Sequence, residues 1–123
     1  MIKYLKLSFL VLFFSGTLFA QQSSVYTHEL TEFNRAVELY KDKQYQAAQI
    51  LFDKVKSKTD NMEVESDCAY YIANCAIRLD QMGADFLVES FVEDYPTSTK
   101  TNQAYIEVAH YYFDQGNYPK SLE

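Results

Sequence analysis

Apolar positions along the chain recur at helical spacing, and the clearest example lies in residues 104–123. Apolar side chains stand there at positions i, i+3, i+4 and i+7, so they share one face of an α-helix. They are Tyr105, Val108, Ala109 and Tyr112. Gly116 then breaks the period, because glycine readily takes the left-handed backbone conformation that ends a helix. The stretch predicts a helix, a short turn and a second helix that starts near Tyr118.

The same unit occurs three times, at a period of about 36 to 37 residues, which is the signature of a repeat architecture. Five positions of the last copy have counterparts 73 residues earlier: Ala36 and Ala109, Leu39 and Tyr112, Tyr40 and Phe113, Tyr45 and Tyr118, Ala48 and Ser121. Ala73, Ala76 and Ala84 mark a middle copy. Its first-helix alanine, Ala73, lies 37 residues after Ala36, whereas its second-helix alanine, Ala84, lies 36 residues after Ala48. The turn between the two helices of the middle copy is therefore expected to be one residue shorter than in copy one. The pattern predicts an all-α chain of antiparallel helix pairs.

Helix boundaries follow from turn and capping residues. We expect helices at 27–42, 44–58, 62–79, 83–94, from Ser98 or Thr99 to Asp114, and from Tyr118 onward. Thr27 is expected to cap the first helix, Pro96 to end the fourth, and Ser98 or Thr99 to cap the fifth. The six residues of 118–123 are too few to cover the apolar face of the fifth helix. We therefore expect the chain to be the N-terminal piece of a longer array.

At these positions the sequence resembles the tetratricopeptide repeat (TPR) family, whose pattern sets small and aromatic residues in the first helix, an alanine in the second and a closing proline. The matches are Ala36, Tyr45, Ala48 and Phe52; Ala73, Ala84 and Pro96; Tyr105, Ala109, Tyr112, Gly116 and Tyr118. The ending at Pro96 and Ser98 is similar to that of bacterial envelope TPR proteins, among them the outer-membrane assembly lipoprotein BamD and the Tol-Pal-associated TPR proteins. Where the family has its first tryptophan, this chain has Glu32, Ala69 and Tyr105. The resemblance implies a TPR-type α-solenoid of about two and a half repeats, at 27–60, 61–97 and 98–123.

Residues 1–20 have the features of a secretory signal peptide. Lys3 and Lys6 precede an apolar run that starts at Leu7, and Ala20 offers a cleavage site. The run of 14 residues would span about 21 Å of a ~30 Å hydrocarbon core, so a membrane anchor fits poorly. We expect cleavage after Ala20, a short segment at 21–26, and no transmembrane segment in the mature chain.

Gln21 follows the expected cleavage site, where a lipoprotein would have its acylated cysteine. We therefore expect an exported protein without a lipid anchor. The resemblance to bacterial envelope TPR proteins implies a location in the periplasm or at the outer-membrane periphery of a Gram-negative bacterium. The formal net charge of −6 becomes −8 when Lys3 and Lys6 are removed. An acidic chain repels the phosphate backbone, so we expect no nucleic-acid partner.

The two cysteines stand seven residues apart on one expected helix. Seven residues rise about 10.5 Å, whereas the Cα atoms of a disulfide lie within about 7 Å. We expect Cys68 and Cys75 to be unpaired and buried. Neither His28 nor His110 is close to them in sequence, so we expect no metal site. The chain has no phosphate-binding loop and no nucleophile-elbow motif, so we expect neither enzyme activity nor a cofactor.

Aromatic residues are abundant, and those at helix-packing positions are expected in the core: Phe52, Phe91, Tyr105 and Tyr112. The TPR resemblance implies that the first helix of each pair lines a groove. By register its residues are Phe33, Val37, Tyr40 and Lys41; Tyr70, Asn74, Ile77 and Arg78; Ile106, His110, Phe113 and Asp114. Such a mixture suits an extended peptide or a partner helix, although the protein's own following helices could fill the groove instead. We expect Tyr70 to contribute most to binding affinity and Arg78 to contribute chiefly to the association rate. Alternatively, Asp114 could hold Arg78 in a surface ion pair.

The resemblance implies a protein–protein interaction scaffold of the cell envelope, with a protein or peptide partner and possible association with the outer membrane. Two other functions stay open. One is a glycan-binding protein of the TPR-containing nutrient-uptake type, which would use exposed tyrosine and asparagine side chains. The other is a helical regulatory segment of a larger envelope enzyme.

Overall fold

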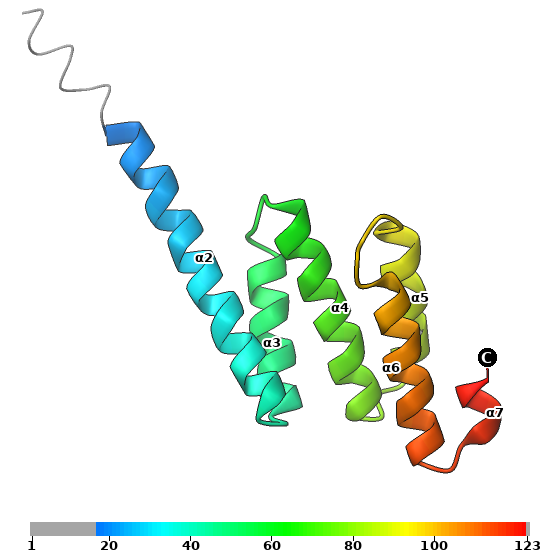
Figure 1. The fold of residues 1–123 in the computed structure, drawn as a ribbon. Coiled ribbons are helices and arrows are strands. Elements are labelled where there is room, and N and C mark those ends of the chain that lie inside the picture. The colour runs from blue at the N-terminus through cyan, green and yellow to red at the C-terminus, as the bar shows by residue number, and fades with distance from the viewer. Residues whose placement is uncertain (1–16, 123) are drawn as a thin grey trace, which may run out of the picture. The chain divides into compact units, whose positions relative to one another are not determined.

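The computed structural model describes residues 17–122, in which six α-helices and no strands occur (Figure 1). The helices are α2 (Thr17–Lys41), α3 (Tyr45–Lys56), α4 (Met62–Arg78), α5 (Ala84–Asp94), α6 (Thr101–Asp114) and α7 (Tyr118–Ser121). The chain divides into units Met1–Thr31 and Glu32–Glu123, and the packing below is that of the second unit. The all-α prediction is confirmed for the described residues. We call α2, α4 and α6 the first helices, and α3, α5 and α7 the second helices.

The first helix begins at Thr17, so the prediction that Thr27 caps it is wrong. The Thr31 hydroxyl donates to the Thr27 carbonyl at 2.8 Å, a bond typical of a helix interior. No glycine or proline interrupts residues 21–26, so nothing local stops the helix there. Most of the predicted signal peptide, residues 1–16, lies outside the described residues. Within the described part of the chain, no helix is long and apolar enough to cross a membrane.

The fifth predicted helix begins at Thr101 rather than at Ser98 or Thr99. Lys100 occupies the N-cap position, and no side chain caps the helix. The Ser98 hydroxyl instead accepts a hydrogen bond from the Lys100 amide at 3.2 Å, which closes a turn just before the helix. The predicted ends of α3, α4 and α5 fall within two residues of those observed.

The three first helices end in the same backbone turn. A residue with positive φ follows each of them: Lys43 (60°), Asp80 (53°) and Gly116 (73°). In each turn two amides donate back to the helix, as Gly116 does to the Phe113 carbonyl at 2.9 Å and Asn117 to the Tyr112 carbonyl at 2.8 Å. This pair of bonds is the Schellman motif. The left-handed residues lie 37 and then 36 positions apart, which confirms the repeat period.

The second helices bury equivalent residues at the predicted spacing. The buried residues of α3 are Ala48, Phe52 and Val55, and those of α5 are Ala84, Val88 and Phe91, each 36 positions later. Ala84 is the first residue of α5, however, whereas Ala48 is the fourth of α3. The connection before α5 therefore has five non-helical residues, 79–83, against three, 42–44, before α3. The prediction that this turn is one residue shorter is therefore wrong, because the connection is two residues longer. The buried stripe still has the 36-residue spacing because α5 starts at its first buried residue, Ala84, whereas α3 starts three residues before Ala48.

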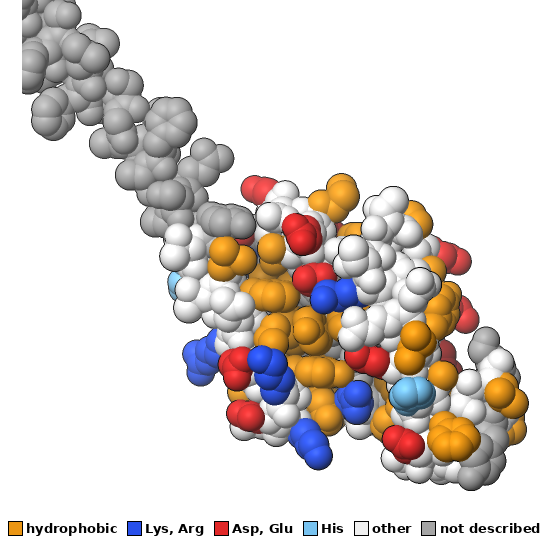
Figure 2. Space-filling model, in the orientation of Figure 1, with side chains coloured by type: hydrophobic (Ala, Val, Ile, Leu, Met, Phe, Trp, Pro, Cys, Tyr) orange, Lys and Arg blue, Asp and Glu red, His pale blue; other side chains and the backbone are white. Residues whose placement is uncertain are grey.

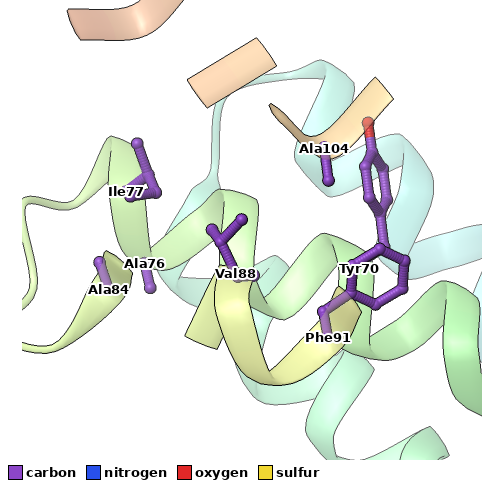
Figure 3. Packing of buried hydrophobic residues seen from close by; sticks show 8 residues of the cluster. Tyr70, Ala76, Ile77, Ala84, Val88, Phe91 and Ala104 are labelled. Carbon is purple, nitrogen blue, oxygen red and sulfur yellow. The ribbon is translucent and has the colours of Figure 1, made fainter. Parts of the chain in front are cut away.

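Helix α4 is the centre of the packing, because it contacts α3, α5 and α6 (Figure 1). One core cluster joins α4 to α5 and α6, and Figure 3 shows its side chains. Its buried members are Tyr70, Ala73, Ala76, Ile77, Ala84, Val88, Phe91 and Ala104. The other cluster joins α4 to α2 and α3, through Ala36, Ala48, Phe52, Val55, Cys68 and Cys75.

The expected core aromatics divide between interior and surface. Phe52 and Phe91 are buried, as predicted. Tyr112 is partly buried against the core cluster that joins α4 to α5 and α6. Tyr105 is 50% exposed, so its assignment to the core is wrong. Ala104 is the residue of α6 that faces α4, and the next residue of a helix points about 100° away.

Polar contacts hold the short helix α7 against its neighbours. The Tyr112 hydroxyl donates to Asp85 Oδ1 at 2.6 Å, and Lys120 Nζ donates to Asp85 Oδ2 at 2.5 Å. The hydrogen bond from Lys120 is the main cause that lowers the pKa of the Asp85 carboxyl, and the hydrogen bond from Tyr112 lowers it further. One carboxylate thereby links α5, α6 and α7.

Cys68 and Cys75 are free thiols on α4, and both are buried. Burial raises the pKa of each thiol to about 12.

We expect the intact mass of the folded protein to be the same before and after reduction, because Cys68 and Cys75 do not pair. We also expect alkylation at neutral pH to be slow until denaturant is added, because the thiolate is the reactive species. A mass two hydrogens lower before reduction would contradict the single-helix placement.

Candidate functional site

The predicted groove residues fall into three environments, one for each first helix. On α2, Phe33, Val37 and Tyr40 are half-buried and pack against the core cluster that joins α4 to α2 and α3. On α4, Tyr70 and Asn74 are buried and Arg78 is half-buried. On α6, Ile106, His110, Phe113 and Asp114 are exposed.

Tyr70 and Asn74 do not line an open groove as expected, because they belong to the interior. They are 2% and 3% exposed. Asn74 Nδ2 donates to the Tyr70 carbonyl at 3.0 Å, which satisfies the buried amide within α4. Burial is the main cause that raises the pKa of the Tyr70 phenol, and a hydrogen bond with Glu107 raises it further. Helix α6 packs on this part of α4, so a partner could reach neither side chain.

Tyr71 is the centre of an aromatic cluster between α2, α3 and α4 that was not predicted from the sequence. Its ring stacks on Phe52, with centroids 4.6 Å apart and planes 2° apart. It also makes edge contacts with Phe33, Tyr40 and Tyr70. The signal was present in the sequence, because Tyr71 extends the helical spacing of Cys68 and Cys75 at i, i+3 and i+7.

Two basic side chains lie over this cluster, and Figure 2 shows the hydrophobic surface between α2 and α4 with basic groups beside it. The Arg78 guanidinium carbon lies 5.7 Å from the Tyr40 ring centroid and 5.4 Å from that of Tyr45. Arg78 Nε also donates to the Tyr40 hydroxyl at 3.0 Å. The Lys100 ammonium lies 5.5 Å from the Tyr70 centroid. These contacts are within the range of cation–π attraction and hold both cations in place.

A hollow of about 530 Å³ opens beside Arg78, between the turn after α2, the end of α4 and helix α6. We call it the α4–α6 hollow. Its lining residues are Lys43, Tyr45, Arg78, Glu107, His110, Tyr111, Asp114 and Gln115. It brings together three predicted groove residues, namely Arg78, His110 and Asp114. The predicted ion pair between Arg78 and Asp114 is not among the salt bridges of the described residues, since Arg78 bonds to Tyr40 instead.

The α4–α6 hollow is lined by side chains of both charges. Lys43 and Arg78 supply positive charge, and Glu107 and Asp114 supply negative charge. Tyrosine, histidine and glutamine side chains add hydrogen-bonding groups and flat apolar surface. The lining contains no serine, threonine or cysteine, so it offers no hydroxyl or thiol nucleophile of those kinds.

A second hollow of about 450 Å³ lies where the α5–α6 connection meets the start of α4. Its walls include Ser66, Asp67, Tyr95 and Lys100, and the Tyr95 hydroxyl bonds Glu65 Oε1 at 2.7 Å. Burial raises the pKa of Asp67, and Lys100, with its ammonium 3.8 Å from Oδ1, opposes that rise. None of the predicted groove residues lies in this hollow.

Among the residues that the structure describes, no group of three or more histidine, cysteine, aspartate or glutamate side chains is placed to hold a metal ion. Comparison of the chain with known protein families, with curated proteins and with solved structures found no match.

Proposed function

We propose that this protein is an exported, TPR-type interaction scaffold of a Gram-negative cell envelope, and that the α4–α6 hollow binds an extended segment of a partner protein. The observation that carries the proposal is the hollow itself, which gathers Arg78, His110 and Asp114 from two first helices. The repeated helix-end turns at Lys43, Asp80 and Gly116 support the TPR-type assignment.

The size and the polarity of the hollow favour a peptide segment over a globular surface. Ligand sites typically have volumes of about 300 to 1,000 Å³, and the hollow lies within that range. An extended segment presents backbone donors and acceptors that His110, Gln115 and the charged groups can bond. Arg78 is already held by Tyr40 and Tyr45, so little side-chain entropy would be lost on binding.

We expect Lys43→Ala combined with Asp114→Ala to weaken partner binding by about 1 kcal/mol, or roughly fivefold, because exposed charges at a binding site contribute modestly. Both side chains are exposed, so helicity should not change. The measurement is recovery of partners from envelope extract by the tagged protein, quantified by mass spectrometry and paired with circular dichroism.

The matched control is Lys58→Ala with Asp60→Ala, which removes the same charges at exposed positions away from the hollow. This control should recover partners as the wild type does. Equal recovery by the hollow variant and the control would refute the assignment of the hollow. Binding on a glycan array without any captured protein would favour the glycan-binding alternative.

A further inference from the structure

The α4–α6 hollow has positive charge on one wall and negative charge on the other. Lys43, in the turn after α2, and Arg78, the last residue of α4, supply the positive charge. Glu107 and Asp114 supply the negative charge, and both belong to α6. Among the described residues, no salt bridge joins the two walls. Unlike charges therefore border one space without neutralising each other.

The Arg78 side chain is held in place by contacts that leave its terminal nitrogens unbonded. Its guanidinium carbon lies 5.7 Å from the Tyr40 ring centroid and 5.4 Å from that of Tyr45, and its Nε donates to the Tyr40 hydroxyl at 3.0 Å. Neither terminal Nη group has a hydrogen-bond or ion-pair partner in the part of the chain that the structure describes. A guanidinium can bind a carboxylate through two parallel N–H···O bonds. Arg78 is thus preorganised to bind one carboxylate.

The two carboxylates of α6 differ in how far they are already engaged. Glu107 is half-buried and accepts a hydrogen bond from Gln103 Nε2 at 2.9 Å. Asp114 is exposed, and no described residue forms a hydrogen bond or an ion pair with its carboxylate. Asp114 is therefore the carboxylate of this wall that is free to bind a cation.

We infer that the partner segment carries one acidic and one basic side chain, the acidic one bound by Arg78 and Lys43 and the basic one by Asp114. This inference rests on the proposed function, because it names the chemistry of the segment that the α4–α6 hollow binds. The segment runs through the hollow, so both groups are internal side chains and no chain terminus is needed.

The charges of the lining disfavour a segment of a single sign. Its two cations balance its two carboxylates, so the lining favours neither sign as a whole. A second acidic residue would approach Asp114, a second basic residue would approach Arg78, and like charges repel. An apolar segment would cover the Arg78 guanidinium without supplying an acceptor, which costs free energy. A segment of both signs supplies a partner to each wall.

The described continuation of the chain lies elsewhere. Helix α7 follows α6 and is joined to α5, since Lys120 donates to Asp85. No residue of α7 lines the hollow. Within the described residues, the hollow is therefore left open to a segment of another molecule.

Selection from a library of displayed peptides with random internal sequence tests the chemistry without a known partner. We expect the peptides that bind the protein to share one acidic and one basic residue at a constant separation. Asp114→Asn should abolish enrichment of the basic residue and keep that of the acidic residue. The matched control Asp60→Asn, at an exposed position outside the hollow, should leave both residues enriched.

A double-mutant cycle on one selected peptide, synthesised with acetylated and amidated ends, tests the contact with Arg78. We expect Arg78→Gln to weaken binding by about tenfold, because it removes a bidentate charged contact. The loss should fall below about twofold when the acidic residue of the peptide is replaced by its amide. Equal losses for the two peptides would overturn the inference.

Lys43→Gln provides a second cycle that does not depend on a half-buried residue. Lys43 is exposed, so its replacement should leave helicity unchanged in circular dichroism. We expect a loss of about threefold that again requires the acidic residue of the peptide. If Arg78→Gln lowers helicity, this cycle decides, and a loss independent of the acidic residue would overturn the inference.

Failure of this inference differs from failure of the proposed function. Selected peptides that lack the charge pair, but bind Lys43→Ala with Asp114→Ala more weakly than the wild type, would overturn the charge pair and keep the hollow as the peptide site. Peptides that bind this variant as well as the wild type would overturn the hollow itself, as would the absence of any enriched peptide. Binding that requires a free terminal carboxylate would overturn the inference alone.

Discussion

Phe52→Ala is expected to destabilise the protein by about 3 to 5 kcal/mol, the largest effect of any single substitution considered. Phe52 is 0% exposed and stacks on Tyr71 at 4.6 Å, with Phe33 against its edge at 5.7 Å. Its removal would leave a cavity where α2, α3 and α4 meet. Urea unfolding followed by circular dichroism measures the loss in free energy of unfolding.

Phe86→Ala is the matched control, since Phe86 has the same side chain on a second helix but is 67% exposed. It should change the free energy of unfolding by less than about 0.5 kcal/mol. Similar losses for the two substitutions would contradict the packing of α3 against α4 described above.

Ala84→Leu is expected to cost about 1 to 3 kcal/mol, because it overpacks a close helix contact. Ala84 is 5% exposed, and Figure 3 shows it next to Ala76 of α4. Two alanines at one contact let the backbones of α4 and α5 approach, and three added carbon atoms have no space there. The shift of the urea midpoint at constant slope measures the effect.

Two further alanines serve as comparisons for Ala84→Leu. Ala109→Leu should cost less than about 1 kcal/mol, because Ala109 is only half-buried on α6. Ala47 lies at an exposed position of α3, so Ala47→Leu should leave the free energy of unfolding nearly unchanged. If Ala109→Leu proved as costly as Ala84→Leu, Ala109 would have to be packed more tightly than its half-buried position indicates.

The positions of the helices could be predicted because they depend on local signals. Apolar spacing located α3 to α6 within a few residues, and Gly116 and Pro96 marked helix ends by their backbone preferences. The same local reasoning failed at Thr27, since a capping residue does not start a helix when the preceding residues can also be helical. It failed at Ser98 for a related reason, because its hydroxyl closed a preceding turn instead.

The candidate site could be predicted only in part, because its residues come from different helices. Arg78, His110 and Asp114 were expected on one face, and the structure brings them together in the α4–α6 hollow. Lys43, Glu107 and Gln115 were not expected there, because their place depends on how α6 packs against α4. The register placed Tyr70 and Asn74 on the same face as these residues, but it could not show that α6 buries them.

The helical period and the buried stripes could be predicted without the structure, because both repeat within 36 to 37 residues and depend on side chains close together in the chain. Which helix faces are buried and which are exposed depends on how the helices pack against one another. Equivalent residues have opposite environments: Ile77 is 2% exposed, whereas its counterpart Phe113 is 59% exposed. Burial depends on the neighbouring helices: α4 packs against α3, α5 and α6, whereas α6 packs against α4, α5 and the short helix α7.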